Sequence, residues 1–232
     1  MSEAARAAVF VHGAGGGGWE WNVWARVFAA HGYEVHAPDL MAGPQGLAAT
    51  TLGDYAAQAG GWLGAARREQ QGGRLVLVGA SLGGLLALMK ADAADALVLV
   101  NPLPPDGLPS PPRPAVVPWG REASLAGTRR AMPDADDAAA LYAFRRWRDE
   151  SGRVLDQACA GVAIAPVRAP VLVLASDGDE DVPPAASEAL ARQLGARLHC
   201  WPGSHVGPLL GRRAAEAAEQ AVEWLNGIAL RA

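Results

Sequence analysis

The sequence predicts an α/β fold with a doubly wound, mostly parallel six-stranded sheet. Two observations predict this class. Short apolar runs typical of buried strands alternate with longer segments of helical spacing along the chain. Glycine-rich and polar segments also follow several of these runs, at the carboxyl ends of strands where parallel sheets carry their chemistry.

Each element is expected from local composition. The six strands are expected at 7–11, 33–37, 75–78, 96–100, 170–176 and 197–201. Helices are expected between them, over 19–30, 85–89, 185–194 and 212–230, and from Thr51 or Asp54 to about 69. Within 19–30, the spacing of Val23, Val27 and Ala30 predicts the face that packs on the sheet.

Between the fourth and fifth expected strands the composition changes. Eight prolines fall between positions 102 and 118 and predict an extended connection, because proline breaks both helices and strand ladders. The following segment, 132–162, is predicted to be helical. We interpret 102–165 as a cap-like insertion in a single domain spanning 1–232. Its aromatic residues are expected either to line a substrate pocket or simply to pack on the sheet: Trp119, Tyr142, Phe144 and Trp147.

Composition excludes several classes of function. Half of the 232 residues are hydrophobic, and the net charge of −4 without a Lys/Arg run argues against nucleic-acid binding. No apolar stretch approaches the about 18 residues of a membrane span. The two cysteines lack metal-ligand spacing, and the first residues lead directly into a strand without room for a signal peptide. We therefore expect a cytoplasmic protein with reduced thiols, no metal and no membrane partner.

The run Gly79–Ala80–Ser81–Leu82–Gly83 predicts a nucleophile elbow. It joins a buried strand to a helix, the context that a G-x-S-x-G motif requires. Glycines two residues before and after the serine relieve clashes in a tight, strained turn. The Ser81 hydroxyl is then expected above the sheet edge, at the N-terminus of the helix.

A serine nucleophile needs a base, and the base needs an orienting carboxylate. Two segments downstream of Ser81 supply them in the order acid, then histidine. The first contains Asp177, Asp179 and Asp181 after the fifth expected strand. The second contains His205 in a Gly/Pro-rich loop after the sixth.

The glycine-rich loop after the first strand permits two interpretations. Gly13-x-Gly15-x-x-Gly18, with Asp39 after the next strand, matches a dinucleotide fingerprint and would indicate a reductase. Alternatively, the Ala14 and Leu82 N–H groups form an oxyanion hole, and His12 braces the loop. Bulky tryptophans after the third glycine disfavour the first interpretation, which also leaves the serine, aspartate and histidine unexplained.

Several segments taken together resemble the α/β-hydrolase superfamily, in particular its compact esterase and hydroxynitrile-lyase branch. They are His12–Gly13–Ala14, the Gly/Trp segment to Trp21, Asp39–Leu40, the elbow, Asp179-x-x-Val182–Pro183 and Gly203–Ser204–His205. The resemblance implies a cofactor-free enzyme and selects Asp179, three residues before a Val–Pro pair, as the acid. Ala80 departs from the usual larger residue before the serine, and the insertion matches no known cap.

The expected function is that of a serine hydrolase, a carboxylesterase that cleaves a small apolar ester, thioester or lactone through an acyl-enzyme. Ser81, Asp179 and His205 would form its triad. A lyase or acyltransferase using the same triad is an alternative, because fold and function dissociate. The expected partner is a small-molecule substrate. The sequence is also compatible with a homodimer.

Overall fold

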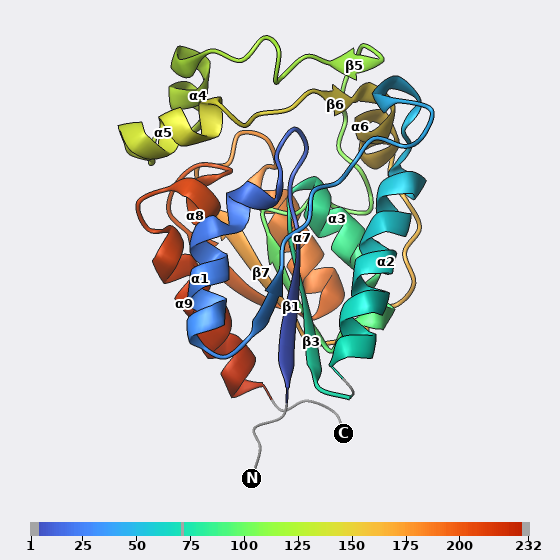
Figure 1. Cartoon of the computed structure of the whole chain (residues 1–232), viewed down its shortest axis with the longest axis vertical. Coiled ribbons are helices and arrows are strands. Elements are labelled where there is room, and N and C mark those ends of the chain that lie inside the picture. The colour runs from blue at the N-terminus through green and yellow to red at the C-terminus, as the bar shows by residue number, and fades with distance from the viewer. Residues whose placement is uncertain (1–4, 71, 229–232) are drawn as a thin grey trace.

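The computed structural model describes residues 5–70 and 72–228. Its centre is one six-stranded sheet in the order β2-β1-β3-β4-β7-β8 (Figure 1). All five strand pairings are parallel. The strands are β1 (Arg6–Val11), β2 (Glu34–His36), β3 (Arg74–Ala80), β4 (Ala96–Val100), β7 (Val171–Ser176) and β8 (Arg197–Trp201). The predicted doubly wound parallel sheet is confirmed.

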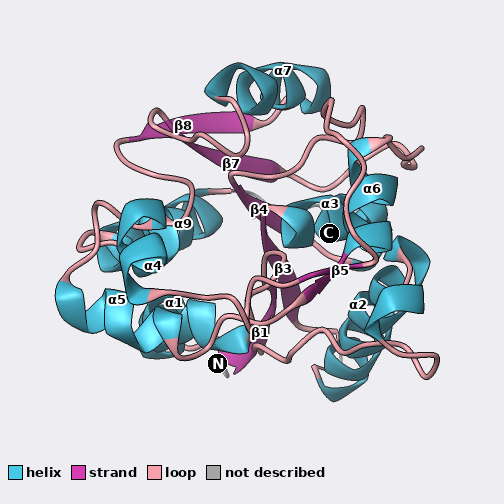
Figure 2. Cartoon of the chain, turned by 90° about the horizontal axis from the view of Figure 1, so that it is seen from above, coloured by secondary structure: helices cyan, strands magenta, loops and turns pink. Residues whose placement is uncertain are grey.

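Helices cover both faces of the sheet (Figure 2). One face carries α1 (Asn22–Ala30), α8 (Gly207–Leu210) and α9 (Ala214–Gly227). The other carries α2 (Leu52–Glu69), α3 (Leu82–Met89) and α7 (Pro184–Leu194), and α6 (Gly152–Cys159) packs on α2 and α3 from above the sheet edge. Of the helix predicted over 212–230, residues 229–230 lie outside the described residues. None of the described helices is long and apolar enough to cross a membrane.

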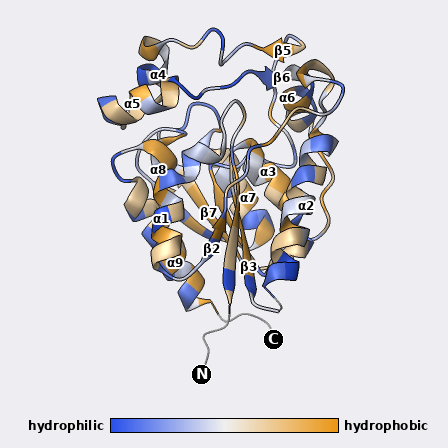
Figure 3. Ribbon diagram, viewed as in Figure 1, coloured by the Kyte–Doolittle hydropathy of each residue, from blue (hydrophilic) through white to orange (hydrophobic). Residues whose placement is uncertain are grey.

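The two faces of the sheet bury separate hydrophobic cores because successive side chains of a strand point in opposite directions. In β1, Val9 and Val11 pack under α2 and α3, whereas Ala8 and Phe10 pack under α1 and α9. The central strands are therefore apolar on both faces, as their orange colour in Figure 3 shows. This two-sided burial explains why the strands appear in the sequence as continuous apolar runs.

The core-facing side of α1 differs from the prediction. Val23 is 36% exposed and Ala30 is also exposed, whereas Trp24 and Phe28 are fully buried. A 3₁₀ turn, η1 (Gly18–Trp21), precedes the helix. Aromatic packing determines which face is buried: the Phe10 ring lies 5.1 Å from that of Phe28, and Trp24 contacts the same cluster.

Residues between β4 and β7 lie over the carboxyl edge of the sheet, at the top of Figure 1. They contain β5 (Val116–Val117), α4 (Leu125–Ala131), α5 (Asp137–Phe144), β6 (Glu150–Ser151) and then α6. The helical segment predicted over 132–162 is therefore wrong in part, because α5 and α6 are separated by an extended stretch. That stretch includes β6, which pairs antiparallel with β5. The remaining short turns are η2 (Leu47–Ala49) and η3 (Ala91–Ala93).

Candidate active site

Ser81 occupies a strained turn between β3 and α3. Its backbone has φ 52° and ψ −118°, a region that a non-glycine residue rarely adopts. The flanking glycines are required by close contacts. A Cβ on Gly79 would lie 2.2 Å from the Gly83 carbonyl oxygen, and one on Gly83 would lie 2.1 Å from the Val11 oxygen. The turn thus has the geometry expected of a nucleophile elbow, with Ser81 as the N-cap residue of α3.

His205 and Asp179 meet at the same end of the sheet, in the loops that follow β8 and β7. His205 Nδ1 lies 2.7 Å from Asp179 Oδ2. Because a carboxylate only accepts, Nδ1 carries the hydrogen and donates it, which leaves Nε2 with its lone pair. The Asp179 side chain is 1% exposed, and its Oδ1 accepts from the Asp181 and Val182 amides at 2.9 and 2.8 Å. The carboxylate is therefore fixed on both oxygens.

The other two acids of this loop have different surroundings. Asp177 Oδ1 accepts from the Gly203 amide at 3.0 Å and so links the two loops. Asp181 is exposed and lines the cavity described below. Within the described chain, Asp179 is the one acid of the three at hydrogen-bond distance from the imidazole.

Two further residues hold the histidine loop in place. Asn101, at the end of β4, adopts φ 45°; its Nδ2 donates to the His205 carbonyl at 2.7 Å, and its Oδ1 accepts from the Ser176 amide at 2.7 Å. Asp134, from the insertion, accepts from the Ser204 amide at 2.9 Å and from the Ser204 hydroxyl at 2.7 Å. The insertion therefore helps to position the histidine.

The amides of the loop after β1 differ in their hydrogen-bond partners. Gly13 donates to Glu20 Oε2 at 3.2 Å, and Gly15 donates to Glu150 Oε2 at 3.0 Å. Between these two amides, the Ala14 N–H has no protein acceptor among the described residues. Leu82 begins α3, where an N–H has no partner within its own helix. Ala14 and Ser81 both line the same cavity.

His12 braces this loop, as predicted. It is 1% exposed; Nδ1 donates to the Gly13 carbonyl at 2.8 Å, and Nε2 accepts from the Leu40 amide at 2.8 Å. Burial lowers the pKa of His12 from 6.5 to about 4, the hydrogen bond to Gly13 opposing this and the nearby Arg148 adding to it. The imidazole is therefore neutral at physiological pH.

The insertion also forms hydrogen bonds with the loop that follows β1. Arg148 donates from its amide to the Gly15 carbonyl at 2.7 Å, and from Nε to the Gly16 carbonyl at 2.6 Å. The buried Glu150 carboxylate, besides holding Gly15, accepts from the Tyr55 hydroxyl at 2.8 Å. Burial, followed by the charge of Glu150, raises the pKa of Tyr55, so the phenol stays protonated and continues to donate.

A cavity of about 820 Å³ lies between the insertion and the sheet edge. Its size is within the range of small-molecule sites. The lining includes Ser81, His205, Ala14, Glu20, Leu103, Leu108, Val117, Trp119, Trp147, Leu155, Val206 and Leu209. Of the four aromatic residues expected to line a pocket, Trp119 and Trp147 do so. Tyr142 and Phe144 are not among the lining residues; Tyr142 packs edge-on against Trp19 and hydrogen-bonds Asn22.

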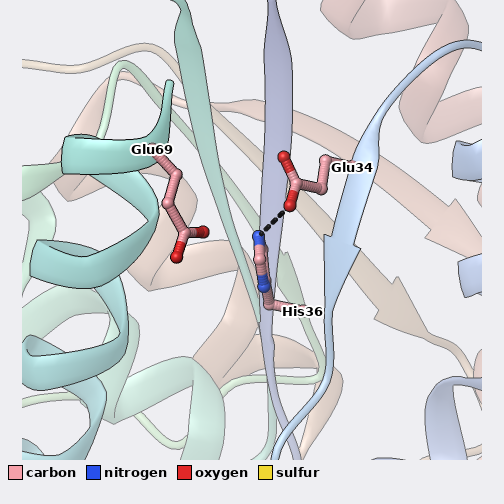
Figure 4. A group of neighbouring side chains, drawn as sticks. All are labelled: Glu34, His36 and Glu69. Carbon is pink, nitrogen blue, oxygen red and sulfur yellow. Dashed lines mark ion pairs between the residues drawn. The ribbon is translucent and has the colours of Figure 1, made fainter. Parts of the chain in front are cut away.

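Among the residues that the structure describes, two side-chain groups have ligand atoms close enough to hold a cation. One is Asp179, Asp181 and His205, in the site itself. The other is Glu34, His36 and Glu69, at β2 and the end of α2, whose side chains converge in Figure 4. There Glu34 already accepts from Gln70 at 2.8 Å and lies 3.5 Å from His36 Nε2. Both glutamates are exposed, as in ordinary surface ion pairs.

The glycine-rich loop does not resemble a diphosphate cradle. Such a cradle needs free amides directed at the phosphates. Here the amides of Gly13, Gly15 and Gly18 donate to the carboxyl groups of Glu20, Glu150 and Asp39, the last at 2.7 Å. This disfavours the reductase interpretation.

Comparisons with known proteins agree with this fold. A model of the alpha/beta hydrolase family matches residues 8–220. A pyrethroid hydrolase from Sphingobium faniae superposes with a TM-score of 0.73 at 19% identity, over 96% of this chain and 98% of that one. A methylesterase from Arabidopsis gives 0.71 at 17% identity, over 95% and 100%. Tomato methylketone synthase I gives 0.72 at 14% identity, over 97% and 99%. No curated protein matches the sequence.

Ser81 and His205 line one cavity at the carboxyl edge of the parallel sheet, an arrangement typical of α/β hydrolases. The family match covers nearly the whole chain, and the chain therefore belongs to the alpha/beta hydrolase family.

Sequence reasoning missed Glu20, Asp134, Arg148 and Glu150. Each is a charged residue that local pattern assigns to a solvated helix or loop. Each acts instead through contacts to backbone groups of another segment or loop. Glu20 contacts Gly13, seven positions away, whereas Glu150 contacts Gly15, 135 positions away. The one available signal was an acid inside a Gly/Trp run, at Glu20.

Proposed function

We propose that the protein is a serine esterase that hydrolyses a small apolar ester, thioester or lactone through an acyl-enzyme. The observation that carries the proposal is the juxtaposition of the strained Ser81 with the His205–Asp179 pair at one end of the sheet, around one cavity. The family match supports a hydrolase, and the similar fold of a methylesterase and a pyrethroid hydrolase agrees with ester cleavage.

In the first half-reaction, Ser81 Oγ attacks the substrate carbonyl while His205 Nε2 takes its proton. Asp179 accepts from Nδ1 and stabilises the imidazolium that results. The tetrahedral intermediate collapses, and His205 returns the proton to the departing alcohol. In the second half-reaction, water attacks the acyl-serine with the same base, releasing the acid and restoring the Ser81 hydroxyl.

The charge that develops on the carbonyl oxygen requires preorganised donors. We assign the Ala14 and Leu82 amides to this task. The unpaired state of the Ala14 N–H and the helix N-terminus at Leu82 support this assignment, because both amides are free to donate.

The cavity supports an apolar substrate. More than half of its lining is aliphatic or aromatic, including Leu103, Trp119 and Trp147 from the insertion and Leu209 from α8. Such a surface binds an acyl or alcohol group through buried apolar area.

A panel of p-nitrophenyl esters of increasing acyl length tests the proposal. We expect hydrolysis with a preference for one chain length by the wild type, and none above background by Ser81→Ala. Circular dichroism should show that the variant is folded, since one hydroxyl contributes little to stability. A folded wild type that cleaves no ester in the panel would contradict the proposal, as would equal rates for the two proteins.

A further inference from the structure

Glu20 is a buried carboxyl group in the candidate site that the reaction above does not use. It comes from η1, is 3% exposed, and lines the cavity together with Gly13 and Ser81. Its Oε2 accepts from the Gly13 amide at 3.2 Å. The loop wraps closely around it, because a Cβ on Gly16 would lie 2.2 Å from Glu20 Oε1.

Charge at Glu20 has little compensation. Among the described residues, no cation lies within ion-pair distance of it. The nearest basic group, Arg148, faces it from the insertion but lies 3.6 Å from Asp39 and donates to the Gly16 carbonyl. His12, at the end of β1, is neutral. The other charged or titratable groups around the loop and cavity include Asp39 after β2, Glu150 on β6, and Asp181 and His205 across the cavity. The insertion adds Arg113, Glu122 and Arg130 to the cavity lining.

The Glu20 carboxyl group lies next to the proposed oxyanion hole, so its charge would affect catalysis. Gly13 is the neighbour of Ala14, whose amide would hold the oxyanion. A carboxylate bonded to the Gly13 amide would oppose negative charge developing nearby, and this opposition is strong in a site that excludes water. A neutral carboxyl oxygen accepts the same hydrogen bond without that repulsion.

We propose that Glu20 is a positioning residue that supports the oxyanion hole only in its protonated form, so that its ionisation turns off ester hydrolysis at alkaline pH. The inference rests on the proposed function and adds its regulation by pH.

The environment of Glu20 agrees with this role. Burial raises the pKa of Glu20 from 4.5 to about 8, and Asp39 adds to the rise, while the Gly13 hydrogen bond and Arg148 oppose it. Because the pKa is raised, the neutral form dominates below about pH 8 and is lost above it. Activity is therefore present on the neutral side and falls on the alkaline side. A general base is active in its unprotonated form, so the fall at alkaline pH is assigned to Glu20.

The test is the pH dependence of kcat and kcat/KM for p-nitrophenyl acetate, from about pH 6 to about pH 10, in wild type, Glu20→Gln and Asp39→Asn. The wild-type rate should fall about tenfold per pH unit above the Glu20 pKa. Glu20→Gln keeps an acceptor for the Gly13 amide and cannot ionise, so its profile should stay flat there. Asp39→Asn keeps an acceptor for Gly18 but loses a charge that favours the neutral carboxyl, so its alkaline limb should move to lower pH.

Return of each sample to neutral pH should restore the full rate, which separates titration from alkaline unfolding. A wild-type profile that stays flat to the end of the range would overturn the inference, as would an unchanged alkaline limb in folded Glu20→Gln. If Glu20→Gln does not fold, the comparison of Asp39→Asn with wild type tests the inference. An alkaline fall in rate that does not move to lower pH in Asp39→Asn would then overturn the role of Glu20. Activity that persists in Ser81→Ala would refute the proposed function itself, whereas a missing limb in a Ser81-dependent enzyme refutes only the role of Glu20.

Discussion

Asn101 Nδ2 donates a hydrogen bond to the main-chain carbonyl of His205 at 2.7 Å, although the two residues are 104 positions apart. The same amide group accepts from the Ser176 amide at 2.7 Å and donates to the Ser176 hydroxyl at 2.9 Å. One side chain at the end of β4 thus joins the ends of β4 and β7 to the histidine loop. Its φ of 45° suits asparagine, which tolerates this region better than most residues.

Asn101→Asp tests this link with minimal change of shape. Aspartate keeps an acceptor for Ser176 but replaces the donor to His205 with an oxygen that repels the carbonyl. We expect a loss of about 1–3 kcal/mol in the free energy of unfolding and a lower kcat, because the histidine loop loses its anchor. Urea unfolding and ester kinetics measure the two effects. A variant with the wild-type free energy of unfolding and the wild-type kcat would show that the hydrogen bond from Asn101 does not position the histidine loop.

Asp179→Asn tests which carboxylate orients the histidine. An amide facing His205 Nδ1 disturbs the tautomer that leaves Nε2 as the base, and the corresponding change in a serine protease costs about 10⁴ in kcat. We therefore expect a loss of several orders of magnitude in ester hydrolysis.

Asp177→Asn and Asp181→Asn are the matched controls in the same loop. Asp181→Asn should be nearly as active as wild type, and Asp177→Asn should lose mainly stability, because Asp177 accepts from the Gly203 amide. If Asp179→Asn kept its activity while Asp177→Asn or Asp181→Asn lost several orders of magnitude in kcat, the assignment of Asp179 would be refuted.

His12 should make the fold sensitive to acid. Its pKa is about 4 in the folded protein and 6.5 for an ordinary histidine, so the unfolded chain binds a proton in this interval that the folded chain does not. The free energy of unfolding should therefore fall as pH decreases from about 6.5 to about 4, by on the order of 3 kcal/mol from this residue. Urea unfolding at several pH values measures the slope.

His12→Gln provides the comparison, because glutamine can still accept from the Leu40 amide and does not titrate. Other groups contribute equally to both proteins, so the difference between the slopes isolates His12. Equal slopes over this interval would mean that the imidazole is protonated in the fold.

Much of the fold could be predicted because its determinants are local. The strands are continuous apolar runs, and the elbow is specified by glycines at Gly79 and Gly83 whose missing side chains allow backbone contact. The placement of serine, acid and histidine at one edge then follows from the parallel topology, which brings the carboxyl ends of β3, β7 and β8 together.

What could not be predicted depends on contacts between distant segments. The alanine-rich insertion has helical propensity throughout 132–162, yet its middle is extended because Glu150 and Ser151 pair with β5 and Arg148 bonds the Gly15 carbonyl. Tertiary contacts override propensity there. The burial of Glu20 escapes local pattern for the same reason, since its partner is the backbone of a loop that folds over it.

The central claim is that Ser81 forms a covalent acyl intermediate, and mass spectrometry after treatment with a fluorophosphonate tests it most directly. The wild-type protein should gain one adduct, and peptide mapping should place it on Ser81, because the activated hydroxyl displaces fluoride from phosphorus. Ser81→Ala should gain none under the same conditions. An adduct on another residue, or an unmodified wild type that nevertheless hydrolyses esters, would contradict the account.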